Sequence, residues 1–129
     1  MVKQITSFNL QNLKDLKGDY LIDVRTPEEW NIFGKPDGEA FGMKTYFVSY
    51  QFYKNNSVIL NPNFEKEINN LNLEKSKKIF FICRSGLRSE ITANIFERKG
   101  FNTYNVLDGF YVDNLTPSWK FNKLPIKKC

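Results

Sequence analysis

The stretch Ile79-Phe80-Phe81-Ile82-Cys83-Arg84-Ser85-Gly86-Leu87-Arg88-Ser89 decides how the rest of the sequence is interpreted. Its first four residues are apolar and either β-branched or aromatic, which is typical of a strand buried on both faces of a sheet. An amphipathic pattern then predicts a helix from about Ser89 to Lys99, ended by Gly100. The residues in between therefore form a loop that joins a buried strand to a helix.

The same alternation of strand and helix extends over most of the chain. Apolar runs predict further strands at residues 20–24, 45–48 and 103–107. A helix is predicted at residues 7–16, and Gly18 is expected to end it. Further helices are predicted from Thr26 onward and at residues 64–73, and a short helix is predicted after residues 108–109. Residues 34–42 resemble a loop, and residues 47–60 show no clear pattern. Strands that alternate with helices favour an α/β fold with a largely parallel sheet.

Length and charge limit the classes of protein that this chain can represent. Its 129 residues, 41% of them hydrophobic, fit one domain over residues 1–129, and a flexible tail is expected at about 121–129. The net charge is +5, but the lysines are scattered and no nucleic-acid motif is present. A small anionic substrate suits this charge, and we do not expect nucleic-acid binding.

The cysteine and histidine counts narrow the chemistry further. Two cysteines, Cys83 and Cys129, are too few for a disulfide scaffold or a zinc site, and the absence of histidine excludes Ser-His-Asp and Cys-His catalysis. No metal or other cofactor is expected. Residues 1–5 lack the apolar core of a signal peptide, and no apolar run is long enough to cross a bilayer. We therefore expect a cytoplasmic protein with no membrane partner.

The loop after the buried strand has the features of an anion site built around a sulfur atom. The N-terminus of a helix directs several backbone N–H groups to one point, and Gly86 lets the backbone curl there. Arg84 and Arg88 add positive charge, so a thiolate at Cys83 is expected to be stabilised without a histidine. A lone cysteine after a strand is more often a small buried apolar residue, but this combination favours a nucleophile.

Three segments together resemble the rhodanese family, in the family's order. Residues 83–89 are similar to its active-site loop. Residues 21–25 and 27–30 resemble its strand-Asp-Val-Arg and Pro-Glu-Glu-aromatic signature, and residues 105–110 its strand-to-Gly-aromatic segment. A weaker similarity to the usual tail lies in Ser118-Trp119-Lys120 and Leu124-Pro125.

The resemblance implies a rhodanese-like fold, with a central, mostly parallel five-stranded sheet flanked by helices on both faces. It implies a sulfurtransferase in which Cys83 takes sulfane sulfur from a small anionic donor such as thiosulfate. The Cys83 persulfide would then pass it to cyanide in the test tube, or to a thiol or protein in a cell. The residues that would bind the donor are Arg84, Ser85, Gly86, Leu87, Arg88 and Ser89. Asp23 and Arg25 would brace the site, although an ordinary strand-end ion pair is an alternative for them.

Two classes of function compete with this interpretation: other enzymes with a cysteine nucleophile, and a non-enzymatic module. Dual-specificity phosphatases that share the fold use Cys-x5-Arg, whereas this loop is Cys-x4-Arg, from Cys83 to Arg88, and suits one terminal sulfur better than a phosphate. An arsenate reductase is disfavoured for the same reason. The second alternative is a non-enzymatic rhodanese-type module that binds a partner protein or relays sulfur for it.

The sequence departs from the family pattern in two places. The usual Gly-His-Ile-Pro-Gly-Ala is replaced by residues 34–40, without the histidine, and an aromatic-rich segment follows at 41–53. Packing in the core is the commoner role of such a segment, and a docking surface for a protein acceptor is the alternative. Cys129 could resolve a Cys83 persulfide as a disulfide, but a disordered terminus is the simpler expectation.

Overall fold

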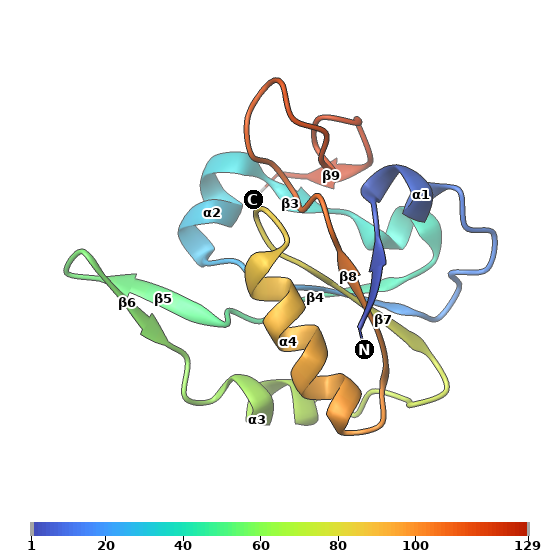
Figure 1. Ribbon diagram of the computed structural model, residues 1–129, viewed down its shortest axis with the longest axis horizontal. Helices are drawn as coiled ribbons and strands as arrows, with labels where there is room; N and C mark the ends of the chain where they lie inside the picture. Colours follow the sequence, from blue (N-terminus) through green and yellow to red (C-terminus); the bar gives the residue numbers. More distant parts are fainter. Residues whose placement is uncertain (1, 129) are drawn as a thin grey trace.

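A five-stranded parallel sheet forms the centre of the computed structural model, which describes residues 2–128 (Figure 1). The strand order is β1-β8-β7-β2-β4, and every neighbouring pair is parallel. The five strands are β1 (Lys3–Ile5), β2 (Tyr20–Asp23), β4 (Lys44–Phe47), β7 (Lys78–Ile82) and β8 (Asn102–Val106). Two small antiparallel pairs lie outside this sheet: β3 (Lys35–Pro36) with β9 (Ile126–Lys127), and β5 (Gln51–Lys54) with β6 (Ser57–Leu60).

Helices and the C-terminal segment cover the two faces of the sheet. The helices are α1 (Ser7–Gln11), α2 (Pro27–Phe33), α3 (Phe64–Asn69), α4 (Leu87–Arg98) and the 3₁₀ helix η1 (Gly38–Phe41). Helices α3 and α4 pack on one face, where Ile68 and Phe96 meet Ile22 and Phe81. On the other face, Leu10 of α1 packs with Phe80 and with side chains of the C-terminal segment.

This double coverage explains the continuous apolar runs of the two middle strands. All four residues of β2 are buried, and so are four of the five residues of β7. Strands with both faces covered need apolar side chains at every position, not at alternate ones. The predicted α/β class, with a five-stranded parallel sheet and helices on both faces, is confirmed.

Several predicted boundaries were wrong. Helix α1 ends at Gln11 and not near Gly18, because Gly18 instead donates its N–H to the Gly42 carbonyl. Helix α3 ends at Asn69, before Asn72 takes a positive φ of 55°. The short helix expected after residues 108–109 is absent from the part of the chain that the structure describes.

The end of the chain packs against the domain as far as it is described. Trp119 is fully buried, and its indole N–H donates to the Pro125 carbonyl at 2.8 Å. Strand β9 then pairs with β3, inside the segment that the sequence suggested was a loop. Cys129, the candidate resolving cysteine, lies outside the described residues.

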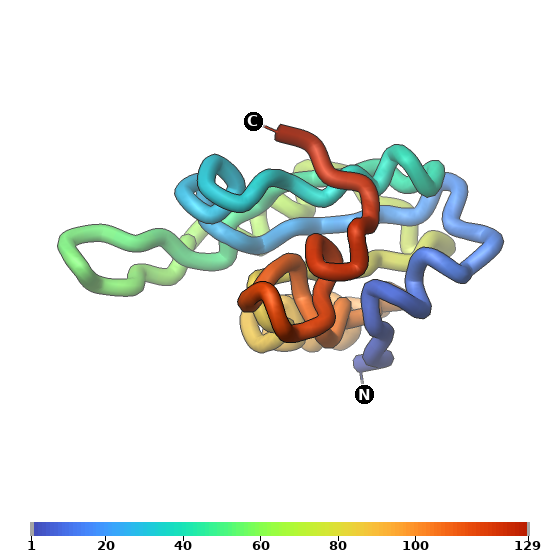
Figure 2. Tube along the Cα trace, turned by 90° about the horizontal axis from the view of Figure 1, so that it is seen from above, coloured from blue at the N-terminus to red at the C-terminus, as the bar shows by residue number. Residues whose placement is uncertain are grey.

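The unclear segment 47–60 contains a β-hairpin that projects from one side of the body (Figures 1 and 2). Asn55 and Asn56 both have positive φ, 52° and 62°, as a two-residue type I′ turn requires. The aromatic residues of 41–53 divide between two environments. Phe41, Tyr46 and Tyr50 pack against the cores, whereas Phe52 and Tyr53 on the hairpin are exposed.

Within residues 2–128, no helix has the length and apolar character needed to span a membrane.

Candidate active site around Cys83

Cys83 directly follows β7, at the edge of the sheet where the parallel strands end. Its carbonyl accepts a hydrogen bond from the N–H of Phe110, just beyond β8, at 2.8 Å. On the other side of β7, the Val24 N–H donates to the carbonyl of Ile82 at 2.9 Å. Ligands of open parallel sheets bind at this edge, so the fold brings Cys83 to the expected place.

The Cys83 sulfur is buried and held by the start of α4. The residue is 1% exposed, and its Sγ accepts the Gly86 backbone N–H at 3.1 Å. The Ser89 hydroxyl oxygen lies 3.2 Å from the same Sγ. The first backbone N–H groups of α4 have no acceptor within the helix, so they are available to an anion at this point.

The loop can take this path because residue 86 is glycine. Gly86 precedes α4 with a φ of 96°, in the left-handed region that disfavours other residues. A Cβ there would lie 2.3 Å from the Leu107 carbonyl oxygen, because the turn after β8 packs directly on the loop. The Cys83 loop and the turn after β8 thus depend on each other for their shape.

Arg88 is held by a carboxylate from another part of the chain. Its Nη1 and Nη2 donate to Glu29 Oε1 and Oε2 at 2.7 and 2.9 Å, a bidentate pair that is largely buried. Burial works against the charge of Arg88, but the Glu29 hydrogen bonds and charge raise the pKa of its guanidinium, with a smaller effect from Cys83. The arginine charge is therefore fixed beside the sulfur.

Glu29 is itself positioned by the first turn of α2. The Thr26 hydroxyl accepts the Glu29 N–H, and the Glu29 side chain accepts the Thr26 N–H, which together form a capping box. Burial alone would raise the pKa of Glu29, but the Arg88 hydrogen bonds and charge, the Thr26 N–H and the charge of Arg25 lower it. The carboxylate stays ionised and keeps Arg88 in place.

Asp23 and Arg25 form a buried ion pair behind the site. Arg25 Nη2 lies 2.8 Å from Asp23 Oδ2, and the side chains are 1% and 0% exposed. Arg25 also donates to the Gly34 carbonyl at 2.8 Å, and its guanidinium lies 4.0 Å from the centre of the Phe110 ring. The pair ties the end of β2 to the residues after α2 and after β8.

The remaining predicted loop residues face outward. Arg84, Ser85 and Leu87 are exposed, and Arg84 Nη2 lies 3.4 Å from the Val112 carbonyl oxygen. Of the two loop arginines, Arg84 has the freer guanidinium, whereas both arms of the Arg88 fork are directed to Glu29. Contact of either arginine with a sulfur donor stays a prediction.

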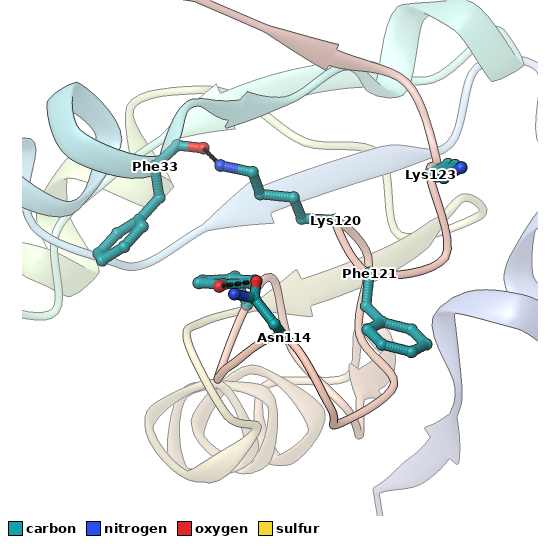
Figure 3. A pocket seen from close by; sticks show the side chains of 6 residues that line it. Phe33, Asn114, Lys120, Phe121 and Lys123 are labelled. Atoms are coloured by element: carbon teal, nitrogen blue, oxygen red, sulfur yellow. Dashed lines mark hydrogen bonds between the residues drawn. The ribbon is translucent and has the colours of Figure 1, made fainter.

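A cavity lies beside the Cys83 loop and not over Cys83. It measures about 490 Å³ and is lined by Phe33, Tyr111, Asn114, Lys120, Phe121 and Lys123 (Figure 3). Lys120 crosses it to donate to the Phe33 carbonyl at 3.1 Å. The Tyr111 N–H donates to the Arg84 carbonyl, so the cavity borders the outer side of the Cys83 loop. Its lining residues come from the end of α2 and from the C-terminal segment.

Three residues that hydrogen-bond to the loop, directly or through one another, were given no site role from the sequence: Glu29, Asn105 and Gln4. The Pro-Glu-Glu segment placed Glu29 in the first turn of a helix, but nothing local indicated a pair with Arg88, 59 residues away. Asn105 lay in a predicted strand and Gln4 in a segment with no predicted structure, and neither was given a role. Within residues 2–128, no group of acidic, cysteine or histidine side chains could hold a metal ion.

Comparison with known proteins agrees with this geometry. A model of the rhodanese-like domain matches residues 9–113. The chain is 40% identical over 128 residues to the uncharacterized protein RP600 of Rickettsia prowazekii, covering 97% of each. It is 31% identical over 117 residues to rhodanese-like domain-containing protein 17 of Arabidopsis thaliana, covering 91% of this chain and 67% of that protein.

Solved structures show the same fold. The crystal structure of Rv0390 from M. tuberculosis superposes with a TM-score of 0.79 at 29% identity, covering 99% of this chain and 98% of that one. A rhodanese-like domain protein from Staphylococcus aureus, at 23% identity, gives a TM-score of 0.60 over 91% of this chain and 98% of its own, and supports the fold alone. The family model and the relatives place this chain in one group: it belongs to the rhodanese-like domain family.

Proposed function

We propose that the protein is a sulfurtransferase in which Cys83 carries a sulfane sulfur atom as a persulfide. One observation carries the proposal: the Cys83 sulfur accepts the Gly86 N–H at 3.1 Å, at the N-terminus of α4 and beside the fixed charge of Arg88. Backbone N–H groups and a cation at this position favour an anionic sulfur. Membership of the rhodanese-like domain family supports a role related to sulfur transfer.

The first step loads the sulfur. The Cys83 thiolate attacks the sulfane sulfur of the donor, a new S–S bond forms, and the bond between that sulfur and the rest of the donor breaks. With thiosulfate as the donor, the leaving group is sulfite, which departs with the bonding electron pair. The negative charge of the enzyme moves from Sγ to the terminal sulfur, where the loop N–H groups can receive it.

The second step returns the enzyme to its starting state. A thiophilic acceptor attacks the terminal sulfur and forms a new bond to it, and the Cys83 thiolate leaves with the electron pair of the broken S–S bond. Cyanide gives thiocyanate in this step, and a thiolate gives a persulfide. A cellular thiol or a protein is the acceptor that we propose, and a small anion is the donor.

Arg84 and Arg88 take different parts in this scheme. Arg88 is held by Glu29 and supplies a fixed positive charge near Sγ. Arg84 is exposed, with one weak contact to the Val112 carbonyl at 3.4 Å, so it is free to turn toward an arriving anionic donor. Loss of Arg84 should therefore raise the donor concentration needed for loading more than it slows the chemical step.

The test is the intact mass of the purified protein after incubation with thiosulfate. We expect the mass of one added sulfur in the parent chain and none in Cys83→Ser, whereas Cys129→Ser should load normally. Absence of loading with every sulfane donor tried would contradict the proposal. Loading without turnover to cyanide would indicate a relay module, and hydrolysis of an aryl phosphate would support the phosphatase alternative.

A further inference from the structure

The cavity between the end of α2 and the C-terminal segment has no part in the proposed function. Its volume of about 490 Å³ lies in the range of small-molecule sites, which combine apolar walls with a few polar groups. Its lining combines three aromatic rings with two lysines and one amide, and none of these six residues is acidic (Figure 3). The composition of the lining therefore favours a ligand that is both apolar and negatively charged.

Lys120 holds a positive charge in place inside this cavity. Its Nζ donates to the Phe33 carbonyl at 3.1 Å and lies 5.3 Å from the centre of the Tyr111 ring. An ammonium group has three N–H donors, so two remain for a ligand after the bond to Phe33. The aromatic ring attracts the cation but does not neutralise it. Within residues 2–128, Lys120 forms no ion pair, so its charge is fixed and uncompensated.

Lys123 supplies a second charge from a strained backbone position. Its φ is 61°, in the left-handed region, whereas the other non-glycine residues of positive φ in the described chain are asparagines, which tolerate it. The Lys123 N–H donates to the Lys120 carbonyl and the Leu124 N–H to the Trp119 carbonyl, both at 3.1 Å. These are the two bonds of a Schellman motif, in which glycine is the usual residue at the place of Lys123. No ion pair of Lys123 within residues 2–128 offsets the strain.

Asn114 adds a neutral donor to these two charges. The Tyr111 hydroxyl donates to Asn114 Oδ1 at 2.5 Å, which leaves the NH₂ group of the amide for another partner. The neighbouring carboxylate of Asp113 is not part of the lining, and it accepts the N–H groups of Leu115 and Thr116 at 2.8 Å. The cavity thus offers two ammonium groups and an amide N–H between aromatic walls.

We propose that this cavity is a second binding site, which takes a small organic anion with two carboxylates on an apolar or aromatic body. Each carboxylate would pair with one lysine, and the aromatic rings of the lining would contact the body. Lysine at position 123 weakens the fold relative to glycine, but it provides one of the two charges that such a ligand needs. The proposal goes beyond sulfur transfer, because it requires neither Cys83 nor a persulfide.

The test is a titration of the full chain, labelled with heavy nitrogen, with three probes that differ in charge and share an aromatic ring. The probes are phthalate with two carboxylates, benzoate with one and benzyl alcohol with none, each at millimolar concentration. We expect the backbone NMR signals of residues 111–123 to shift. The affinity should fall from phthalate to benzoate to benzyl alcohol, by about ten-fold for each charge that is lost, as for one hydrogen bond to a charged group.

Lys123→Gly separates binding from folding, because its two expected effects have opposite signs. It should raise the urea midpoint of unfolding by removing the strain, and it should weaken phthalate binding by about ten-fold. Lys120→Gln should weaken phthalate binding to a similar extent. Lys127→Gln is the matched control and should leave binding unchanged, because Lys127 already lies 3.5 Å from Asp37 and 3.6 Å from Glu39.

Several results would overturn the proposal. They are an absence of phthalate binding, equal binding of phthalate and benzyl alcohol, unchanged affinity in both Lys120→Gln and Lys123→Gly, and signal shifts confined to residues 83–89. Failure of sulfur loading would contradict the proposed function but leave this site intact, since the titration uses no sulfur donor.

Discussion

The Cys83 loop and the β5–β6 hairpin begin at the same edge of the sheet but are held in opposite ways. The loop is fixed by Glu29 from α2, by Asn105 from β8 and by the turn at Leu107. The hairpin projects from the body (Figure 2). Phe52, Tyr53 and residues 58–60 are exposed on it. The shape of the loop is thus a property of the whole fold, whereas the hairpin depends mainly on its own two-residue turn.

Within the two compared regions, the largest effect is expected where the loop approaches its neighbour. Gly86→Ala should lower the free energy of unfolding by roughly 3 kcal/mol or more, because left-handed strain adds to a clash with the Leu107 carbonyl. Gly100→Ala is the matched control, since Gly100 has a similar φ of 95° but its nearest neighbour is the flexible end of Lys75 at 3.5 Å. Urea unfolding measures the loss of unfolding free energy in both variants. Equal losses would mean that the close approach at Gly86 contributes nothing.

An intermediate effect is expected from the ion pair that links the loop to α2. Glu29→Gln should cost about 1–2 kcal/mol at neutral pH, because it removes charge-assisted hydrogen bonds to Arg88. The pKa of Glu29 is lowered in the folded protein, so this contribution is complete above its ordinary value of 4.5 and is lost as the pH falls through the lower folded pKa.

Urea unfolding of the parent protein and of Glu29→Gln, from neutral to acidic pH, tests whether the contribution of Glu29 is lost in acid. The difference in free energy between them should shrink as the pH falls below 4.5. Glu28→Gln, at the exposed position next to Glu29, is the control and should show no comparable difference. A difference in free energy of unfolding between the parent and Glu29→Gln that grows as the pH falls would contradict this role of the Glu29–Arg88 pair.

The smallest effect is expected in the hairpin. Phe52 and Ile59 face each other across its strands and are 39% and 46% exposed, so replacing both with serine should change the free energy of unfolding by about 0.5–1 kcal/mol. Phe81→Ala, in the buried middle strand, should cost roughly 3–5 kcal/mol in the same urea experiment. A hairpin loss as large as the Phe81 loss would show that the body of the domain holds the hairpin.

The contrast also explains what the sequence could and could not predict. Residues 79–82 predicted the central strand because a strand buried on both faces is a continuous apolar run, which its own sequence reveals. The position of Cys83 between that strand and a helix followed from the same pattern. Strand β1 escaped prediction because it has three residues, two of them exposed, and forms only by pairing with β8.

The contacts that shape the site could not be predicted, because they join distant parts of the chain. Arg88 seemed free to bind a donor, yet Glu29 occupies both arms of its guanidinium. Asn105 was assigned to a strand, but its amide connects Gln4, 101 residues away, to the Cys83 loop. Residue type suggested the sulfur chemistry that we propose, whereas the fold determines which neighbours surround Cys83.

The central claim is that sulfur is carried on Cys83 itself. Thiosulfate labelled with heavy sulfur at its outer atom, followed by mass analysis of proteolytic peptides under non-reducing conditions, tests it directly. The account predicts one heavy sulfur per chain on the peptide that contains Cys83, and its release as labelled thiocyanate when cyanide is added. Label on the Cys129 peptide alone, or no label on any peptide, would contradict it.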